Sequence, residues 1–184
     1  MPLLAAEPTL YPEDLFDRRI GDDEPWWVLY TLARQEKQLC RHLHAAGRDF
    51  YCPIVERRYR SAGGRARSSY LPLFPNYVFL CGAENARYHA VSTGCVSRCL
   101  PVTDPATFLS ELRQLHQLIA LGAPLTPEER LSPGMRVRVK TGPFAGVEGV
   151  VLKRHSERRL LVMVNFIQRG ASMELGDYEL EPLS

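Results

Sequence analysis

The histidines, cysteines and carboxylates of this 184-residue chain do not form a catalytic or metal-binding pattern. The sequence contains no Walker phosphate loop, no HExxH zinc motif, no GxSxG nucleophile turn and no paired carboxylate motif. The histidines lack metal-ligand spacing with one another or with cysteine, and His42 and His44 would diverge on a helix. We therefore expect no metal, no cofactor and no enzymatic activity.

Cysteine usage and hydropathy predict a cytoplasmic protein. The five cysteines form no CxxC pair, and an odd number in a chain of this size does not suggest a disulfide framework, so we expect reduced and mostly buried thiols. No stretch approaches the ~18 to 20 apolar residues that span a bilayer. A secretory leader would have a basic segment followed by an apolar run, and the N-terminus lacks this pattern.

Positive charge is concentrated in the middle of the chain. Residues 26–120 carry twelve bases and six acids, whereas residues 1–25 carry seven acids and two arginines. The remaining segments are nearly balanced, with a net charge of −1 over 121–131 and +2 over 132–184. A basic region beside an acidic one suits a phosphate-bearing partner, although the excess is far smaller than in histone-like proteins.

Periodicity predicts the elements that position these side chains in the first part of the chain. Residues 26–32 are rich in aromatic and β-branched side chains and predict a strand. Leu39, Leu43 and Ala46 recur at helical spacing, and Gly47 ends that helix. The expected elements are a strand at 26–32, a helix at 35–46, strands at 49–56 and 69–81 around a Gly63-Gly64 hairpin tip, a helix at 84–92, a strand at 95–102 and a helix opened by Asp104-Pro105.

This β-α-β-β-α-β order, with one trailing helix, predicts an α+β ferredoxin-like fold. In that fold the helices cover one face of an antiparallel sheet and leave the other face free for a partner. Residues 1–25 predict an acidic, mobile extension, with local packing through Leu15, Phe16 and Ile20 as the alternative. The domain itself is expected to cover residues 26–120.

The end of the chain predicts a small β-barrel behind a linker. Residues 121–131 contain two prolines and three charges and are expected to be the linker. Within residues 132–184, short strands are expected at 135–140, 147–153, 160–167 and 172–175. In the first of them Met135, Val137 and Val139 alternate with basic residues, so one strand face is apolar and the other basic.

Two motifs carry a family resemblance. The segment VKTGPFAGVEGVV (139–151) resembles the KOW motif, a tight turn between the first two strands of an SH3-like barrel. Its glycines allow positive φ or close backbone approach, and its phenylalanine covers one end of the core. The motif residues are Gly142, Pro143, Phe144, Gly146 and Gly149.

The second motif is LFPNYVF (73–79), which resembles the LFP(G/N)YVF signature of the NusG N-terminal domain. The preceding WVLY (27–30) and QEK (35–37) resemble the opening strand and helix of that domain, and TGCV (93–96) resembles its later turn, except at Cys95. On these residues, which span 26–184, the chain is identified as a member of the NusG/RfaH family. Asn76 and the long arginine-bearing hairpin favour a specialised RfaH-like paralogue, while the intact KOW motif predicts a β-barrel.

The resemblance implies a transcription elongation factor. Members of this family bind the clamp helices of the largest RNA polymerase subunit near the upstream DNA and modulate pausing, termination or antitermination. Carried over by position, the polymerase-binding residues are Tyr30, Tyr77 and Phe79, and the last two share a strand face through their spacing of two. The alternative is that these aromatic residues simply face the core. Whether the factor opposes or promotes termination is left open.

Basic residues at two places are the candidates for contact with upstream or non-template DNA or with nascent RNA. The first group lies at the start of the first helix and comprises Arg34, Lys37, Arg41 and His42. The second group lies on the hairpin and comprises Arg57, Arg58, Arg60, Arg65 and Arg67. The alternatives are a solvated helix face and a charged loop without a fixed partner.

The main competing interpretation is an RNA-binding or ribosome-associated KOW protein that does not bind polymerase. The absence of an RNP-type aromatic motif weighs against it. The resemblance further implies that Phe144, Phe166 and Ile167 of the barrel contact Rho or a ribosomal protein, with burial as the alternative for Phe144. We expect a monomer without a membrane partner.

Overall fold

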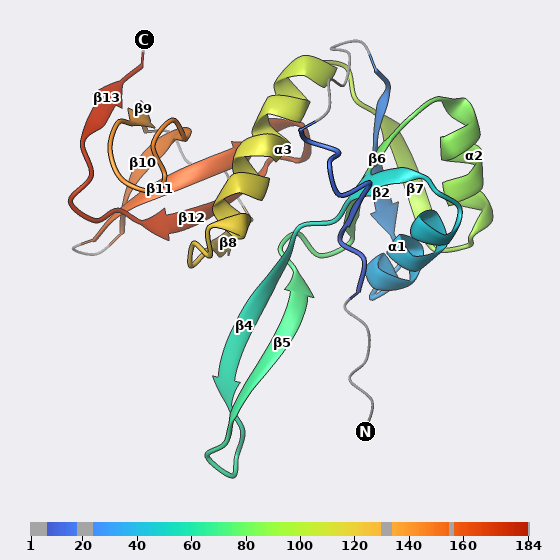
Figure 1. The fold of residues 1–184 in the computed structure, drawn as a ribbon, viewed down its shortest axis with the longest axis horizontal. Helices are drawn as coiled ribbons and strands as arrows, with labels where there is room; N and C mark the ends of the chain where they lie inside the picture. The colour runs from blue at the N-terminus through green and yellow to red at the C-terminus, as the bar shows by residue number, and fades with distance from the viewer. Residues whose placement is uncertain (1–6, 18–23, 130–133, 155–156, 184) are drawn as a thin grey trace. The chain divides into compact units, whose positions relative to one another are not determined.

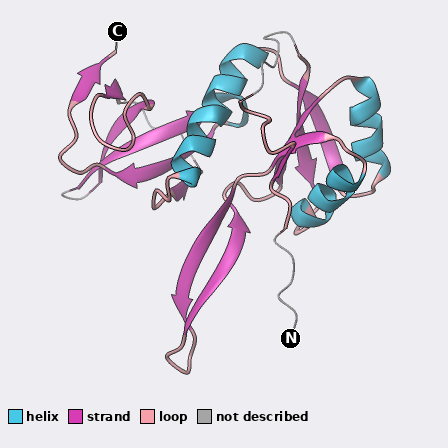
Figure 2. Ribbon diagram, in the orientation of Figure 1, coloured by secondary structure: helices cyan, strands magenta, loops and turns pink. Residues whose placement is uncertain are grey.

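The computed structural model describes residues 7–17, 24–129, 134–154 and 157–183 (Figure 1). Contacts divide the chain into two compact units, Met1–Pro105 and Ala106–Ser184. The first unit combines a sheet, helices and a hairpin, and the second combines a sheet and one long helix (Figure 2).

The first unit has the ferredoxin-like strand order that the sequence predicts. Its strands are β1 (Leu10–Tyr11), β2 (Trp26–Thr31), β3 (Asp49–Tyr51), β6 (Tyr77–Cys81) and β7 (Val96–Pro101). They lie in the order β1-β3-β6-β2-β7, and each neighbouring pair is antiparallel. The last four follow β-α-β-β-α-β with α1 (Glu36–Ala45) and α2 (Glu84–Ser92), so the predicted α+β fold is confirmed.

The core of the first unit lies between this sheet and its two helices. Leu39 and Leu43 of α1 and Ala90 of α2 pack with Leu29 and Leu80 of the central strands. Leu39 and Leu43 are two of the residues predicted to recur at helical spacing, whereas Ala46, the third, is exposed just beyond the end of the helix. Gly47 ends α1 with a φ of +61°, a backbone conformation that glycine adopts without strain.

The predicted hairpin strands are each split in two. Residues 49–60 form β3 and then β4 (Ile54–Arg60), and residues 66–81 form β5 (Ala66–Pro72) and then β6. Prolines 53, 72 and 75 lie at the breaks, because proline has no N–H to donate to a ladder. Among the residues described, strands β4 and β5 pair only with each other, and the hairpin extends away from the main sheet (Figure 1).

The described part of the acidic extension, residues 7–17, packs on the first unit. Strand β1 pairs with β3, and Leu15 and Phe16 are buried, with the Phe16 ring 5.0 Å from that of Tyr51. This is the local packing that the sequence suggested as an alternative to a mobile extension. Ile20 lies outside the described residues.

The second unit contains one antiparallel sheet, in agreement with the expected all-β KOW-type domain. One helix of the chain groups with this sheet. Its strands are β8 (Thr126–Glu128), β9 (Met135–Val139), β10 (Glu148–Arg154), β11 (Glu157–Val164), β12 (Arg169–Glu174) and β13 (Leu180–Pro182). They lie in the order β13-β9-β10-β11-β12-β8. The predicted strand at 160–167 ends at Val164, because a 3₁₀ turn (Asn165–Ile167) and the left-handed Gln168 reverse the chain.

Helix α3 (Pro105–Ala120) groups with the second unit. Leu118 is buried in one core with Val137 and Val162 of the sheet. Strand β8, within the expected linker at 121–131, pairs with β12. The boundaries at residues 120 and 132, which concern separately folding domains, stay a prediction.

Candidate functional site

The glycines of the KOW-like turn have the geometry that the sequence suggested. Gly142 and Gly146 have φ values of +85° and +90°. A Cβ on Gly149 would lie 2.5 Å from the carbonyl oxygen of Leu161, so β10 and β11 approach each other closely there. Phe144 is buried in the core, with its ring centroid 6.0 Å from that of Tyr178. The expected role of Phe144 in covering the core is confirmed, and it offers little surface to a partner.

The LFPNYVF turn is held by a carboxylate from α1. Asn76 has a φ of +69°, and its backbone N–H donates to Oε1 of Glu36 at 2.7 Å. The carbonyl of Asn76 accepts from the N–H of Thr31 at 2.8 Å, which joins the turn to β2. Glu36 is only 6% exposed, so this hydrogen bond replaces its lost hydration. Sequence reasoning noted Glu36 only as part of a motif and missed this role.

The three aromatic candidates for polymerase contact share one sheet face but differ in exposure. Tyr30 and Tyr77 are directly paired across β2 and β6, and their rings meet edge to face with centroids 5.3 Å apart. Tyr30 is 38% exposed and Tyr77 is half-buried, whereas Phe79 has no exposed surface. Of the three, Phe79 therefore occupies the core position that the sequence left open as an alternative.

Two residues of the edge strand β7 extend this face, and sequence reasoning missed both. Arg98 lies opposite Tyr30 and Leu100 opposite Val28, so both side chains lie on the Tyr30 side of the sheet. Both are exposed, Leu100 by 39%. Their position beside Tyr30 follows only from the pairing of β7 with β2, which the sequence pattern does not give. Tyr30, Tyr77, Arg98 and Leu100 are called the aromatic patch below.

The basic candidates around α1 differ in exposure and in whether a carboxylate pairs with them. Arg34 has a left-handed φ of +63° and is exposed in the turn before the helix. Lys37 is half-buried and His42 is exposed. Arg41 donates from one guanidinium nitrogen to both carboxylate oxygens of Glu7, at 2.7 and 2.8 Å. The acidic extension thus neutralises one of the four expected nucleic-acid contacts.

All five hairpin arginines are exposed, and one of them has a partner. A guanidinium nitrogen of Arg58 lies 3.3 Å from Oε2 of Glu56. Ser68 donates to the other oxygen of Glu56 at 2.5 Å. These hydrogen bonds, first from Ser68 and then from Arg58, lower the pKa of the Glu56 carboxyl. Arg57, Arg60 and Arg67 lie on the strands, and Arg65 lies in the turn between them.

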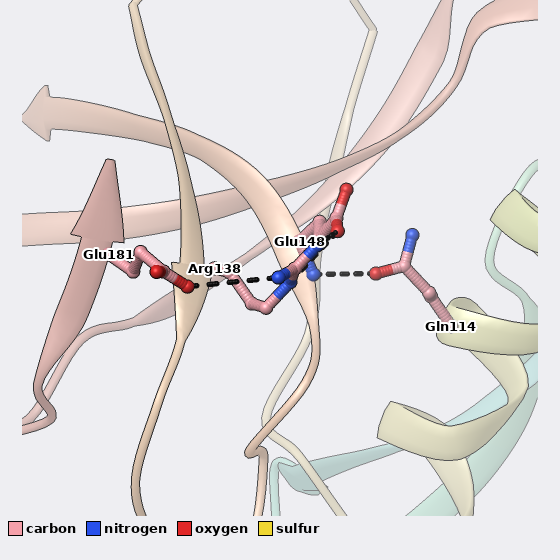
Figure 3. Close-up of polar contacts among 4 residues, drawn as sticks. All are labelled: Gln114, Arg138, Glu148 and Glu181. Atoms are coloured by element: carbon pink, nitrogen blue, oxygen red, sulfur yellow. Dashed lines mark hydrogen bonds and ion pairs between the residues drawn. The ribbon is translucent and has the colours of Figure 1, made fainter. Parts of the chain in front are cut away.

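The basic strand face that the sequence predicts on β9 is partly neutralised. Arg138 donates to Oε1 of Glu148 on β10 and lies 3.7 Å from a carboxylate oxygen of Glu181 on β13 (Figure 3). The Glu148 carboxylate raises the pKa of Arg138. Gln114 of α3 accepts from the backbone N–H of Glu148 at 2.6 Å, and Glu111 accepts from that of Asn165 at 3.0 Å. This network joins three strands and α3.

The described residues contain no group of three or more His, Cys, Asp or Glu side chains placed to hold a metal ion. Cys40, Cys52, Cys81 and Cys95 are buried free thiols and Cys99 is half-buried, as the sequence predicted. Over the same part of the chain, no helix is both long and apolar enough to cross a membrane.

Comparison with known proteins agrees with the motifs. The family model described as transcription termination factor nusG matches residues 24–114. The chain is 31% identical over 132 residues to the transcription termination/antitermination proteins NusG of Escherichia coli K12 and Yersinia pestis, covering 65% of this chain and 70% of each relative. A solved structure of Thermotoga maritima NusG, 21% identical, aligns with 88% of this chain and 98% of its own, with a TM-score of 0.45.

The relatives are matched over 70% of their own length at 31% identity, and the family model matches residues 24–114. The chain therefore belongs to the NusG family of transcription termination and antitermination factors, which are non-enzymatic.

Proposed function

We propose that this chain binds RNA polymerase through the aromatic patch and thereby modulates pausing, termination or antitermination. The observation that supports the proposal is the exposed pairing of Tyr30 with Tyr77 on the sheet face opposite the helices. Tyrosines suit an interface that must stay hydrated when empty, because each ring combines apolar area with a polar hydroxyl. The proposed partner is the pair of clamp helices of the largest subunit.

Arg98 and Leu100 belong to this proposed contact. Leu100 adds apolar area beside the tyrosines, and the Arg98 guanidinium suits an acidic side chain of the partner. Phe79 is left out of the contact, because a side chain without exposed surface cannot reach a partner.

We propose nucleic acid as a second binding partner of this chain, besides RNA polymerase. Arg34, Lys37 and His42 would contact the upstream duplex or the non-template strand, together with the hairpin arginines. Asn76 and the long hairpin support a specialised paralogue, and the proposed site of action is the cytoplasm. Rho or a ribosomal protein is proposed to contact the second unit near Phe166, which is half-buried, since Phe144 and Ile167 are buried.

The test is co-purification of RNA polymerase with the double variant Tyr30→Ala/Tyr77→Ala of the full chain. Losing one aromatic anchor of an interface typically costs about 2 kcal/mol or more, so the affinity should fall at least roughly thirtyfold. The matched control is Tyr88→Ala on α2, which removes a tyrosine that is 65% exposed outside the aromatic patch. It should bind polymerase as the parent does.

Unchanged polymerase binding by the double variant, with circular dichroism showing a folded chain, would refute the proposed contact. Recovery of ribosomes in place of polymerase by the parent chain would favour the alternative of a ribosome-associated KOW protein.

A further inference from the structure

The register of the hairpin divides its side chains between two faces. Tyr59 pairs with Arg67 and Arg57 with Ser69, so these residues lie on one face, together with Leu71. We call it the Tyr59 face. The other face, called the Glu56 face, carries Glu56, Arg58, Arg60, Ser68 and Tyr70.

The two faces carry the same number of strand arginines but differ in charge. Within the described hairpin the Tyr59 face carries Arg57 and Arg67 and no carboxylate. On the Glu56 face, the carboxylate of Glu56 lies 3.3 Å from Arg58 and accepts from Ser68. One of the two arginines on the Glu56 face is therefore compensated, while both on the Tyr59 face keep their full charge for a partner.

Tyr59 is next to both uncompensated arginines. It lies directly across from Arg67 and two residues along β4 from Arg57, and 48% of its surface is exposed. A ring of this kind offers a flat apolar face for stacking, and the two neighbouring guanidinium groups can contact the phosphates next to the stacked base. Such stacking requires the face of an unpaired base, because duplex bases are already stacked on each other.

We propose that the Tyr59 face of the hairpin binds single-stranded nucleic acid, with a base stacked on Tyr59 and phosphates held by Arg57 and Arg67. This inference rests on the proposed contact of the hairpin arginines with nucleic acid and adds the face, the strandedness and the stacking residue. The strand is either displaced DNA or nascent RNA, which share phosphates and unpaired bases.

The experiment measures binding of the full chain to three fluorescent probes by anisotropy as salt is varied. The probes are a 15-nucleotide dT strand, a 15-nucleotide rU strand and a 15-base-pair duplex. Tyr59→Ala should weaken binding of the preferred single strand about five- to a hundredfold, the range expected for one lost stacking contact, and leave duplex binding unchanged. Tyr59→Phe should keep the affinity, because the ring is retained.

Matched controls come from the opposite face. Tyr70→Ala removes a tyrosine that is 59% exposed, and Arg58→Gln/Arg60→Gln removes the same formal charge as Arg57→Gln/Arg67→Gln. Only the Tyr59-face variants should lower single-strand affinity strongly, and the Arg57/Arg67 pair should reduce the salt slope by about one to two units. Tighter binding of the dT strand identifies displaced DNA as the source of the strand, and tighter binding of the rU strand identifies nascent RNA.

The proposal is overturned by equal losses from the two faces, by a Tyr59→Ala variant that binds single strands as the parent does, or by a parent chain that binds neither single strand at 50 mM salt. Polymerase co-purification is measured for the same variants and should be unchanged. A failure of the stacking proposal with polymerase binding intact is thereby distinguished from a failure of the proposed function.

Discussion

At the scale of single residues, the turn at Asn76 depends on a side chain from another element. Glu36 lies 40 positions away in sequence and is nearly fully buried, and its Oε1 accepts the N–H of Asn76. Removing one partner of a buried hydrogen bond costs more than the bond itself contributes, because the remaining group keeps its desolvation penalty.

We expect Glu36→Ala to lower the free energy of unfolding by about 1–3 kcal/mol, since it leaves the Asn76 N–H without its acceptor. Asn76→Gly should be nearly neutral, because glycine adopts the observed φ of +69° freely. Urea denaturation of the two variants measures both effects. A Glu36→Ala variant as stable as the parent would show that the hydrogen bond is not required.

Gly149 is the residue at which close packing of strands leaves no room for a side chain. Gly149→Ala places a Cβ 2.5 Å from a backbone oxygen, so one strand must shift, and we expect a loss of about 1–3 kcal/mol or more. The control is Gly63→Ala at the hairpin tip, where a Cβ meets nothing within 4 Å. Thermal unfolding should separate the two variants clearly, and equal melting temperatures would contradict the close approach.

At the scale of elements, the sequence and the contacts assign α3 to different parts of the chain. The sequence places it at the end of the N-terminal domain, and the contacts group it with the second unit. Its sequence position follows β7 directly, and the family model includes its residues 105–114. In the structure Leu118 is buried in the core of the second unit, and Gln114 and Glu111 accept backbone N–H groups of that unit.

We expect a fragment of residues 106–184 to be more stable than one of residues 121–184 by about 2 kcal/mol or more, the lower end of the cost of removing a buried leucine. Chemical denaturation of both fragments measures the difference. Equal stability would instead support the boundary predicted from the sequence, with α3 belonging to the N-terminal domain.

At the scale of the whole molecule, the acidic N-terminal segment and helix α1 interact through Glu7 and Arg41. An exposed ion pair of this kind contributes little to stability, but it competes with a phosphate for the same guanidinium.

Removing three charges by Arg34→Ala/Lys37→Ala/Arg41→Ala should therefore reduce the salt slope of duplex binding by about two units rather than three, because Arg41 is already engaged. In a reconstituted elongation assay the triple variant should still bind polymerase but change pausing less than the parent. An unchanged slope and unchanged pausing would mean that this helix face is only solvated.

The sequence by itself determined the type and order of most elements and the two motifs. Helical and alternating periodicity are local properties, so α1, α2 and the strand order β-α-β-β-α-β followed from neighbouring residues. The positive φ of Gly142 and Gly146 also follows locally, since few other residues adopt it.

Only the tertiary structure decided which side chains are available to a partner. Tyr77 and Phe79 have the same periodicity, yet one is half-buried and the other fully buried, because burial depends on what covers the sheet. Arg98 lies next to Tyr30 because β7 pairs with β2, a strand distant in sequence. Tyr59 lies next to Arg67 because β4 and β5 pair across the hairpin turn. Short β8 and β13 likewise exist only as partners of β12 and β9, since their own sequences are too short to specify a strand.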